Sequence, residues 1–132
     1  MSADLESLGS SNYHIYVKDG YVQLHSNGAK DPHFATNLWR DVVKTCESHN
    51  IYRILGITNT ASSINVDEVQ GVLKLAKYLG LDKVYKMAWV ELNPESNDIV
   101  EFTENVLSSK AINVRSFDKV EKAKDWLFST SK

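Results

Sequence analysis

The sequence predicts an α/β domain: a mixed sheet of about five strands with about four helices packed against it. Two observations support this fold class. An Asp19-Gly20 turn between alternating apolar residues predicts a β-hairpin near the start of the chain. After the hairpin, helical and strand patterns alternate to the end, which is typical of crossover connections between parallel strands. At 132 residues, the chain has the length of one domain.

The hairpin has a register that sorts its side chains by polarity. With Asp19-Gly20 as a two-residue turn, apolar residues pair on one face and polar or aromatic residues on the other. A slip by one residue would mix the two faces, so the pattern favours a single register. The expected pairs are Val17 with Val22 and Ile15 with Leu24 on the apolar face, and Tyr16 with Gln23 and His14 with His25 on the other.

The first helix and the strand that follows it are marked by their ends. Asp31 is the expected N-cap and Pro32 the first helical residue, and Ser48-His49-Asn50 ends the helix. The short apolar run Ile54–Thr58 predicts a strand buried on both faces. The buried stripe of the helix is predicted to contain Phe34, Leu38, Trp39, Val42, Val43 and Cys46.

The second helix and strand are delimited in the same way. Asn65 with Glu68 is a capping-box arrangement, and Gly80 suits the position just beyond the helix end. The alternating run Val84–Glu91 predicts the next strand. The helix residues expected to face the core are Val69, Val72, Leu73, Ala76 and Leu79.

The last third of the chain predicts a helix, a short strand and a final helix. Ile112 and Val114 mark the strand, and Asp118 with Glu121 is expected to cap the final helix. The first of these helices is marked by Ile99, Phe102, Val106 and Leu107, and the residues of the final helix expected to point inward are Val120, Ala123 and Leu127.

Composition narrows the class of protein. The net charge of -2 and the scattered basic residues argue against a nucleic-acid surface. A single cysteine excludes an internal disulfide, the N-terminal residues lack a signal-peptide pattern, and no apolar run approaches the ~20 residues of a membrane span. We therefore expect a cytoplasmic protein with a tail at residues 1–12, a domain at 13–128 and a short tail at 129–132.

The order of elements resembles that of the STAS domain, the fold of anti-sigma-factor antagonists. The second half is similar to the SpoIIAA-like group of small bacterial proteins. There, the strand segment Lys86–Val90 precedes a helix, and Asn113–Phe117 leads into an acidic-capped helix that ends at Trp126-Leu127. The resemblance extends from about Tyr13 to Phe128.

The resemblance implies a non-enzymatic regulatory module that binds another protein through its second helix and the preceding loop. In the antagonists, that loop carries an Asp-Ser pair, and phosphorylation of the serine by a partner kinase breaks binding. In this chain Ser62 or Ser63 takes the place of the serine, and Ala61 stands where the family has Asp. The implied partner-binding helix residues are Asn65, Asp67 and Glu68.

The loop that runs from Thr58 to Asn65 is also a candidate site on its own residues. It follows a central strand and precedes a helix, where ligands of open α/β sheets bind and where a phosphate would be stabilised. However, no Lys or Arg occurs between Arg53 and Lys74, and two carboxylates follow. A solvated turn that caps the helix is the alternative. The candidate phosphoacceptor or binding residues are Thr58, Asn59, Thr60, Ser62 and Ser63.

Other chemically active residues suggest structural roles. His14 and His25 face each other but lack a third metal ligand, and Cys46 lies in a buried stripe without an activating partner. Three acidic residues after the fourth strand are interpreted as a solvated loop. We expect no catalytic residue, cofactor or metal, and the sequence has no nucleotide-binding or hydrolase motif. The acidic residues are Glu91, Glu95 and Asp98, and the expected core or interface anchors are Trp39, Trp89 and Trp126.

A second function class stays open. The SpoIIAA-like fold is similar to that of a lipid-binding domain, so a carrier of a lipid or another small apolar molecule is the alternative to a protein-binding module. An apolar pocket would favour the carrier. A homodimer formed through an edge strand or an exposed aromatic patch is a further expectation. The residues expected to line the pocket are Phe34, Trp39, Trp89 or Phe102.

Overall fold

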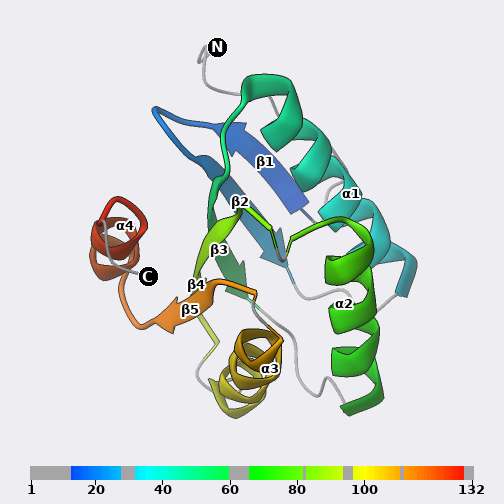
Figure 1. Cartoon of the computed structure of the whole chain (residues 1–132). Helices are drawn as coiled ribbons and strands as arrows, with labels where there is room; N and C mark the ends of the chain where they lie inside the picture. Colours follow the sequence, from blue (N-terminus) through cyan, green and yellow to red (C-terminus); the bar gives the residue numbers. More distant parts are fainter. Residues whose placement is uncertain are drawn as a thin grey trace.

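The computed structural model describes residues 13–27, 32–59, 66–81, 83–93, 97–110 and 112–129. It confirms the predicted class, an α/β fold with a five-stranded mixed sheet and four helices (Figure 1). The elements are β1 (Tyr13–Val17), β2 (Val22–Asn27), α1 (Pro32–His49), β3 (Arg53–Asn59), α2 (Val66–Tyr78), β4 (Lys86–Glu91), α3 (Asn97–Ser109), β5 (Val114–Phe117) and α4 (Val120–Leu127).

The strands lie side by side in the order of the sequence. β1 pairs antiparallel with β2, and β2 to β5 are parallel. The hairpin has the predicted register: Ile15 lies opposite Leu24, and His14 opposite His25. Gly20 adopts φ 86 in the turn, a conformation that favours glycine. The alternation of polarity therefore placed every hairpin side chain on its correct face.

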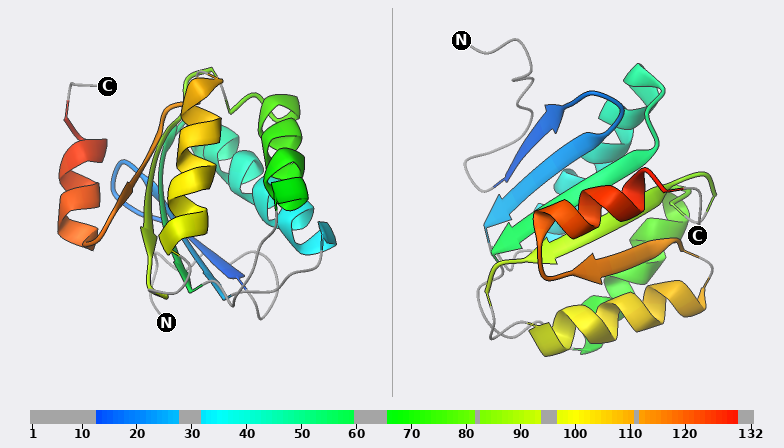
Figure 2. Two further views of the ribbon diagram at one scale, coloured as in Figure 1. Left: turned by 90° about the horizontal axis from the view of Figure 1, so that it is seen from below. Right: turned by 90° about the vertical axis from the view of Figure 1, so that its left-hand side faces the viewer.

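Helices cover the two faces of the sheet unequally. Figure 2 shows α1, α2 and α3 on one face and α4 alone on the other. The three helices α1, α2 and α3 each connect two neighbouring parallel strands. Such crossover connections are right-handed, and because the strands follow one another in the same direction across the sheet, all three helices lie on the same face. α4 packs against β3, β4 and β5, so it leaves β1 and much of β2 uncovered on its face.

The larger core lies between the sheet and the connecting helices. Val42 and Cys46 of α1 pack there on Ile54 of β3 and Met87 of β4. α1 ends as predicted, with Asn50 at φ 55 just beyond its last residue. Cys46 is fully buried, and burial raises the pKa of its thiol to about 12, in keeping with the structural role predicted for it.

Two stacked tryptophans lie over the middle of this core. Trp39 of α1 and Trp89 of β4 stack with ring centroids 5.6 Å apart. The Trp89 ring lies over β3 at Gly56, where an added Cβ would come within 2.4 Å of two ring atoms. Gly56 is therefore the residue that makes room for the Trp89 ring.

The smaller core holds α4 on the opposite face. Leu127 and Trp126 pack against the β3 and β4 side chains of that face. Two neighbouring strand residues, Arg53 and Lys86, hold the end of the helix. Arg53 donates to the carbonyl of Leu127 at 3.0 Å, and Lys86 donates to that of Ser129 at 3.0 Å. Cations at a helix C-terminus are favourable because the last carbonyls lack partners within the helix.

Two details of the predicted elements are wrong. Lys119, not Asp118, is the N-cap of α4; its ammonium has no acceptor with which to cap the helix, and the Asp118 carboxylate pairs with Lys122. β4 begins at Lys86, two residues later than predicted, and Val84 is 65% exposed before it. Phe102 lies in α3, the helix that it was expected to mark, and is 40% exposed. The caps expected at Asp31 and Asn65 lie outside the described residues.

Candidate functional site

The carboxyl ends of β2, β3 and β4 meet at one edge of the sheet. Their register places Ser26 beside Thr58, and Thr58 beside Glu91. Ligands of open α/β sheets bind beyond this edge. The first two residues of the predicted loop, Thr58 and Asn59, thus belong to the end of a central strand, with Thr58 buried and Asn59 exposed.

The remaining predicted site residues are only partly covered by the structure. Thr60, Ser62, Ser63 and Asn65 lie outside the described residues. Asp67 and Glu68 lie in the first turn of α2, as the helix prediction required, and their side chains are not among those described.

Thr58 is part of a hydrogen-bond chain at this edge. Its hydroxyl donates to Oε1 of Glu91 at 2.7 Å and accepts the indole N–H of Trp89 at 3.2 Å. The backbone N–H of Asn93 donates to Oε2 of Glu91 at 3.1 Å. Both oxygens of the Glu91 carboxylate are therefore engaged, and the chain fixes the strand end and the turn after β4.

The interpretation of Glu91 as part of a solvated loop was incomplete. Glu91 is half-buried and bonded to Thr58 across the sheet. Aligning the ends of the two predicted strands would have placed these two residues side by side. Glu95 lies outside the described residues, and the side chain of Asp98 is not described.

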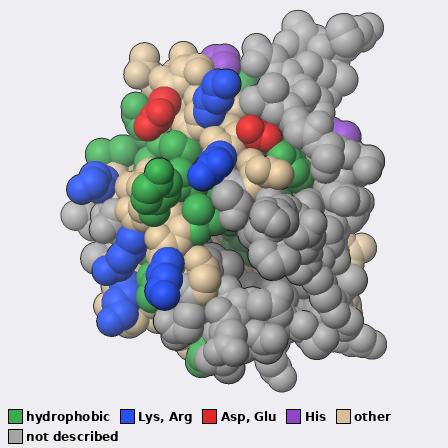
Figure 3. Space-filling view, turned by 90° about the vertical axis from the view of Figure 1, so that its right-hand side faces the viewer, with side chains coloured by type: hydrophobic (Ala, Val, Ile, Leu, Met, Phe, Trp, Pro, Cys, Tyr) green, Lys and Arg blue, Asp and Glu red, His purple; other side chains and the backbone are tan. Residues whose placement is uncertain are grey.

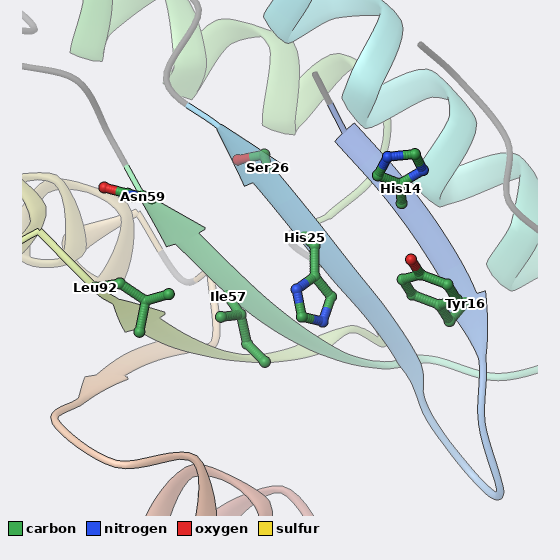
Figure 4. A pocket seen from close by; sticks show the side chains of 7 residues that line it. All are labelled: His14, Tyr16, His25, Ser26, Ile57, Asn59 and Leu92. Atoms are coloured by element: carbon green, nitrogen blue, oxygen red, sulfur yellow. The ribbon is translucent and has the colours of Figure 1, made fainter. Parts of the chain in front are cut away.

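An open pocket of about 230 Å³ lies on the face that α4 leaves uncovered. β1, β2, β3 and the residue after β4 supply its lining (Figure 4). The rings of Tyr16 and His25 meet edge to face at 5.6 Å, and Tyr16 stacks on His14 at 6.4 Å. The lining residues are His14, Tyr16, His25, Ser26, Ile57, Asn59 and Leu92.

His25 has a defined tautomer in this pocket. Burial, followed by the positive charges of Lys18 and His14, lowers its pKa, so its ring is neutral at pH 7. The amide nitrogen of Gln23 lies 2.6 Å from Nε2 of His25 and donates to it, while the Gln23 amide oxygen accepts the hydroxyl of Tyr21 at 3.4 Å. The proton of the neutral ring therefore resides on Nδ1.

The pocket differs from the one that the sequence suggested. Trp39 and Trp89 stack on each other in the opposite core, and Phe102 lies on α3 on that same side of the sheet. The side chain of Phe34 is not described. Sequence reasoning missed Tyr16, Ile57 and Leu92 as pocket residues, because only the uncovered sheet face brings them together.

The described part of α2 presents basic and aromatic side chains to solvent. Lys74 and Lys77 are exposed, and Tyr78 at the end of the helix is 78% exposed. The turn after the helix exposes Lys83 and Val84. Figure 3, which shows the side of the molecule with α1 and α2, has Lys and Arg side chains gathered at its lower left beside hydrophobic ones. We call Lys74, Lys77, Tyr78, Lys83 and Val84 the α2 surface.

Comparison of the sequence with protein-family models and with curated proteins found no match. Among the described residues, no helix is both long and apolar enough to cross a membrane. In the same part of the chain, no group of three or more His, Cys, Asp or Glu side chains lies close enough to hold a metal ion.

Proposed function

We propose that this protein is a non-enzymatic, STAS-like regulatory module that acts by binding another protein. The α2 surface is the observation that carries the proposal. An exposed tyrosine offers a large, rigid contact area and a hydroxyl, and tyrosine is enriched in the residues that dominate binding energy at interfaces. The resemblance to anti-sigma-factor antagonists implies the same helix.

The charge of the α2 surface suggests the character of the partner. Three lysines, Lys74, Lys77 and Lys83, are exposed close in sequence to two exposed apolar side chains, Tyr78 and Val84. Complementary charge speeds association and selects among partners. The expected partner therefore presents an acidic surface with an apolar centre. By the same resemblance, phosphorylation of Ser62 or Ser63 next to this helix would alter binding, because it adds negative charge.

Photo-crosslinking in the native host tests this proposal. A benzophenone amino acid at position 78 is expected to give one crosslinked species whose mass identifies a partner protein. The same amino acid at position 122, on the exposed side of α4, is the control and is expected to give none. Replacing Lys74 and Lys77 together by Glu should weaken the crosslink at 78. Equal crosslinking at 78 and 122, or none at 78, would contradict the proposal.

The phosphorylation part has a separate test. The intact mass of the denatured protein from its host, followed by fragment mapping, is expected to show a phosphoryl group on Ser62 or Ser63. An unmodified chain under every growth condition would remove the switch from the proposal and leave binding through α2 standing.

Small-molecule binding is a second candidate function, and the pocket beside β1 and β2 favours it. Its lining combines two aliphatic side chains, Ile57 and Leu92, with three rings, His14, Tyr16 and His25. Apolar walls with a few placed polar groups are typical of ligand sites. Native mass spectrometry of the purified protein tests this function, since a bound ligand adds mass that is lost on denaturation.

A further inference from the structure

The pocket on the uncovered sheet face has a polar side whose donors are oriented by the surrounding protein. The amide nitrogen of Gln23 donates a hydrogen bond to Nε2 of His25, and the Tyr21 hydroxyl donates one to the amide oxygen of Gln23. Figure 4 shows the other ring nitrogen, Nδ1, on the side of His25 that faces Ile57. Within the part of the chain that the structure describes, no hydrogen-bond acceptor is assigned to this Nδ1–H. It is a donor directed toward the pocket.

The other polar groups and the local charge favour an acceptor with negative charge. The Asn59 amide, which can donate, lies at the carboxyl edge of the same pocket, whereas the Ser26 side chain points to the opposite sheet face, as does that of its cross-strand partner Thr58. The groups whose charge influences His25 belong to two basic residues, Lys18 and His14, and Lys18 carries a positive charge at pH 7. Glu91 engages Thr58, which faces away from the pocket on β3.

The apolar side of the pocket limits the size of the hydrocarbon part of a ligand that carries this acceptor. Ile57 and Leu92 supply an aliphatic wall, and the rings of His14 and Tyr16 lie opposite. The volume of about 230 Å³ is smaller than the roughly 300–1,000 Å³ typical of sites for drug-sized ligands. A short hydrocarbon or a single ring fits this space, whereas a two-chain lipid does not.

We propose that this pocket binds a small organic carboxylate, with the carboxylate on His25 Nδ1–H and the Asn59 amide and the hydrocarbon against Ile57 and Leu92. The inference deepens the second candidate function, small-molecule binding, on which it rests, and is independent of binding through α2. The ligand class follows from chemistry: neutral donors beside basic groups stabilise an anion, and the small apolar wall selects a short body.

The test is a titration of the full chain followed by amide chemical shifts in NMR spectra, with butyrate, butan-1-ol and butylammonium as probes. These probes share one hydrocarbon and differ in charge. We expect butyrate to shift the signals of residues 14, 25, 26, 57, 59 and 92 and to saturate with Kd of roughly 1 mM or tighter, as for ligands of few heavy atoms. Butanol should bind about tenfold more weakly, since it offers no charged acceptor, and butylammonium more weakly still.

Variants assign the binding to the named donors. His25→Leu and, separately, Asn59→Leu should each weaken butyrate binding about tenfold. Asn59 is exposed, so its variant keeps the test valid if His25→Leu fails to fold. His49→Gln, at the far end of α1, is the matched control and should leave the affinity unchanged.

Two results would overturn the inference and have different consequences. If butanol or butylammonium binds at these residues as tightly as butyrate, the carboxylate assignment is wrong and small-molecule binding stands. If no probe shifts these signals and the native mass spectrum shows no bound ligand, the pocket is not a ligand site and both fail.

Discussion

Replacing Gly56 by alanine tests how β3 accommodates the stacked pair of Trp39 and Trp89 on one of its faces. An added Cβ would lie 2.4 Å from Cε3 and Cζ3 of Trp89 and 2.8 Å from Cδ2. Carbon atoms in favourable contact lie about 3.5–4.0 Å apart, so the ring has to move by more than about 1 Å. That movement separates it from Trp39 and from the hydroxyl of Thr58, which accepts its indole N–H at 3.2 Å.

The magnitude follows from three losses and one gain. Overpacking costs about 1–3 kcal/mol, and the aromatic pair and the indole hydrogen bond contribute about 0.5–1.5 kcal/mol each. Alanine in place of glycine within a strand recovers roughly 0.5–1 kcal/mol. We expect Gly56→Ala to lower the free energy of unfolding by about 1–5 kcal/mol, compared with the roughly 5–15 kcal/mol of an ordinary domain.

Urea unfolding followed by tryptophan fluorescence and circular dichroism measures this change. Gly71→Ala is the matched control, because Gly71 lies within α2 with no atom within 4 Å of the added Cβ. It should stabilise the protein by about 0.5–1 kcal/mol. In a Trp89→Leu background, Gly56→Ala should cost much less. A Gly56→Ala protein as stable as the wild type, or the same cost without Trp89, would refute the reasoning.

Three further predictions concern α4, the cysteine and a tyrosine. Arg53→Ala and Lys86→Met should each destabilise the domain by about 1–2 kcal/mol and speed amide exchange in α4, since each removes a charged donor from the end of that helix. Cys46, with a pKa of about 12 and no exposed surface, should resist alkylation at pH 8 until urea unfolds the protein. Burial and the 2.6 Å bond to Asp41 raise the pKa of Tyr13 from 10.0 to about 12. The folded state then holds this proton more firmly than the unfolded state. The stability linked to Tyr13 is therefore full below pH 10 and is lost as the pH rises toward 12.

Each of these predictions has its own control. Lys122→Ala removes a cation from the exposed face of α4 and should change stability little, so an equal effect at Lys122 would count against the helix-end role of Arg53 and Lys86. Rapid alkylation of the native protein would show that Cys46 is accessible. For Tyr13, the Tyr13→Phe variant should lose less stability between pH 10 and 12, and identical pH profiles would rule out the proposed cause.

The local pattern predicted most of the fold. Alternation in the hairpin set its register to the residue, because one face had to be apolar. The ends of α1 and the strand Arg53–Asn59 also followed from short-range signals. The error at α4 arose between two local signals: Asp118 pairs with Lys122, four residues along the chain, and Lys119 occupies the N-cap position.

The candidate site was predicted only in its position. The sequence by itself placed the end of β3 at Thr58, within one residue of its last residue Asn59, and so at the edge beyond which open α/β sheets bind ligands. It also determined that His14 and His25 lie opposite each other, because a two-residue turn sets the register of the hairpin. Both features could be predicted because they depend on residues that are close in sequence.

Tertiary structure decided which of these residues share a site. The bond between Thr58 and Glu91 joins residues 33 positions apart, and it depends on the register of two parallel strands that no turn connects. The pocket depends on where α4 lies: this helix covers β3 to β5 and stops short of His14, Tyr16 and His25. Periodicity shows which face of a helix or strand is apolar, but the packing of distant segments decides which face stays open.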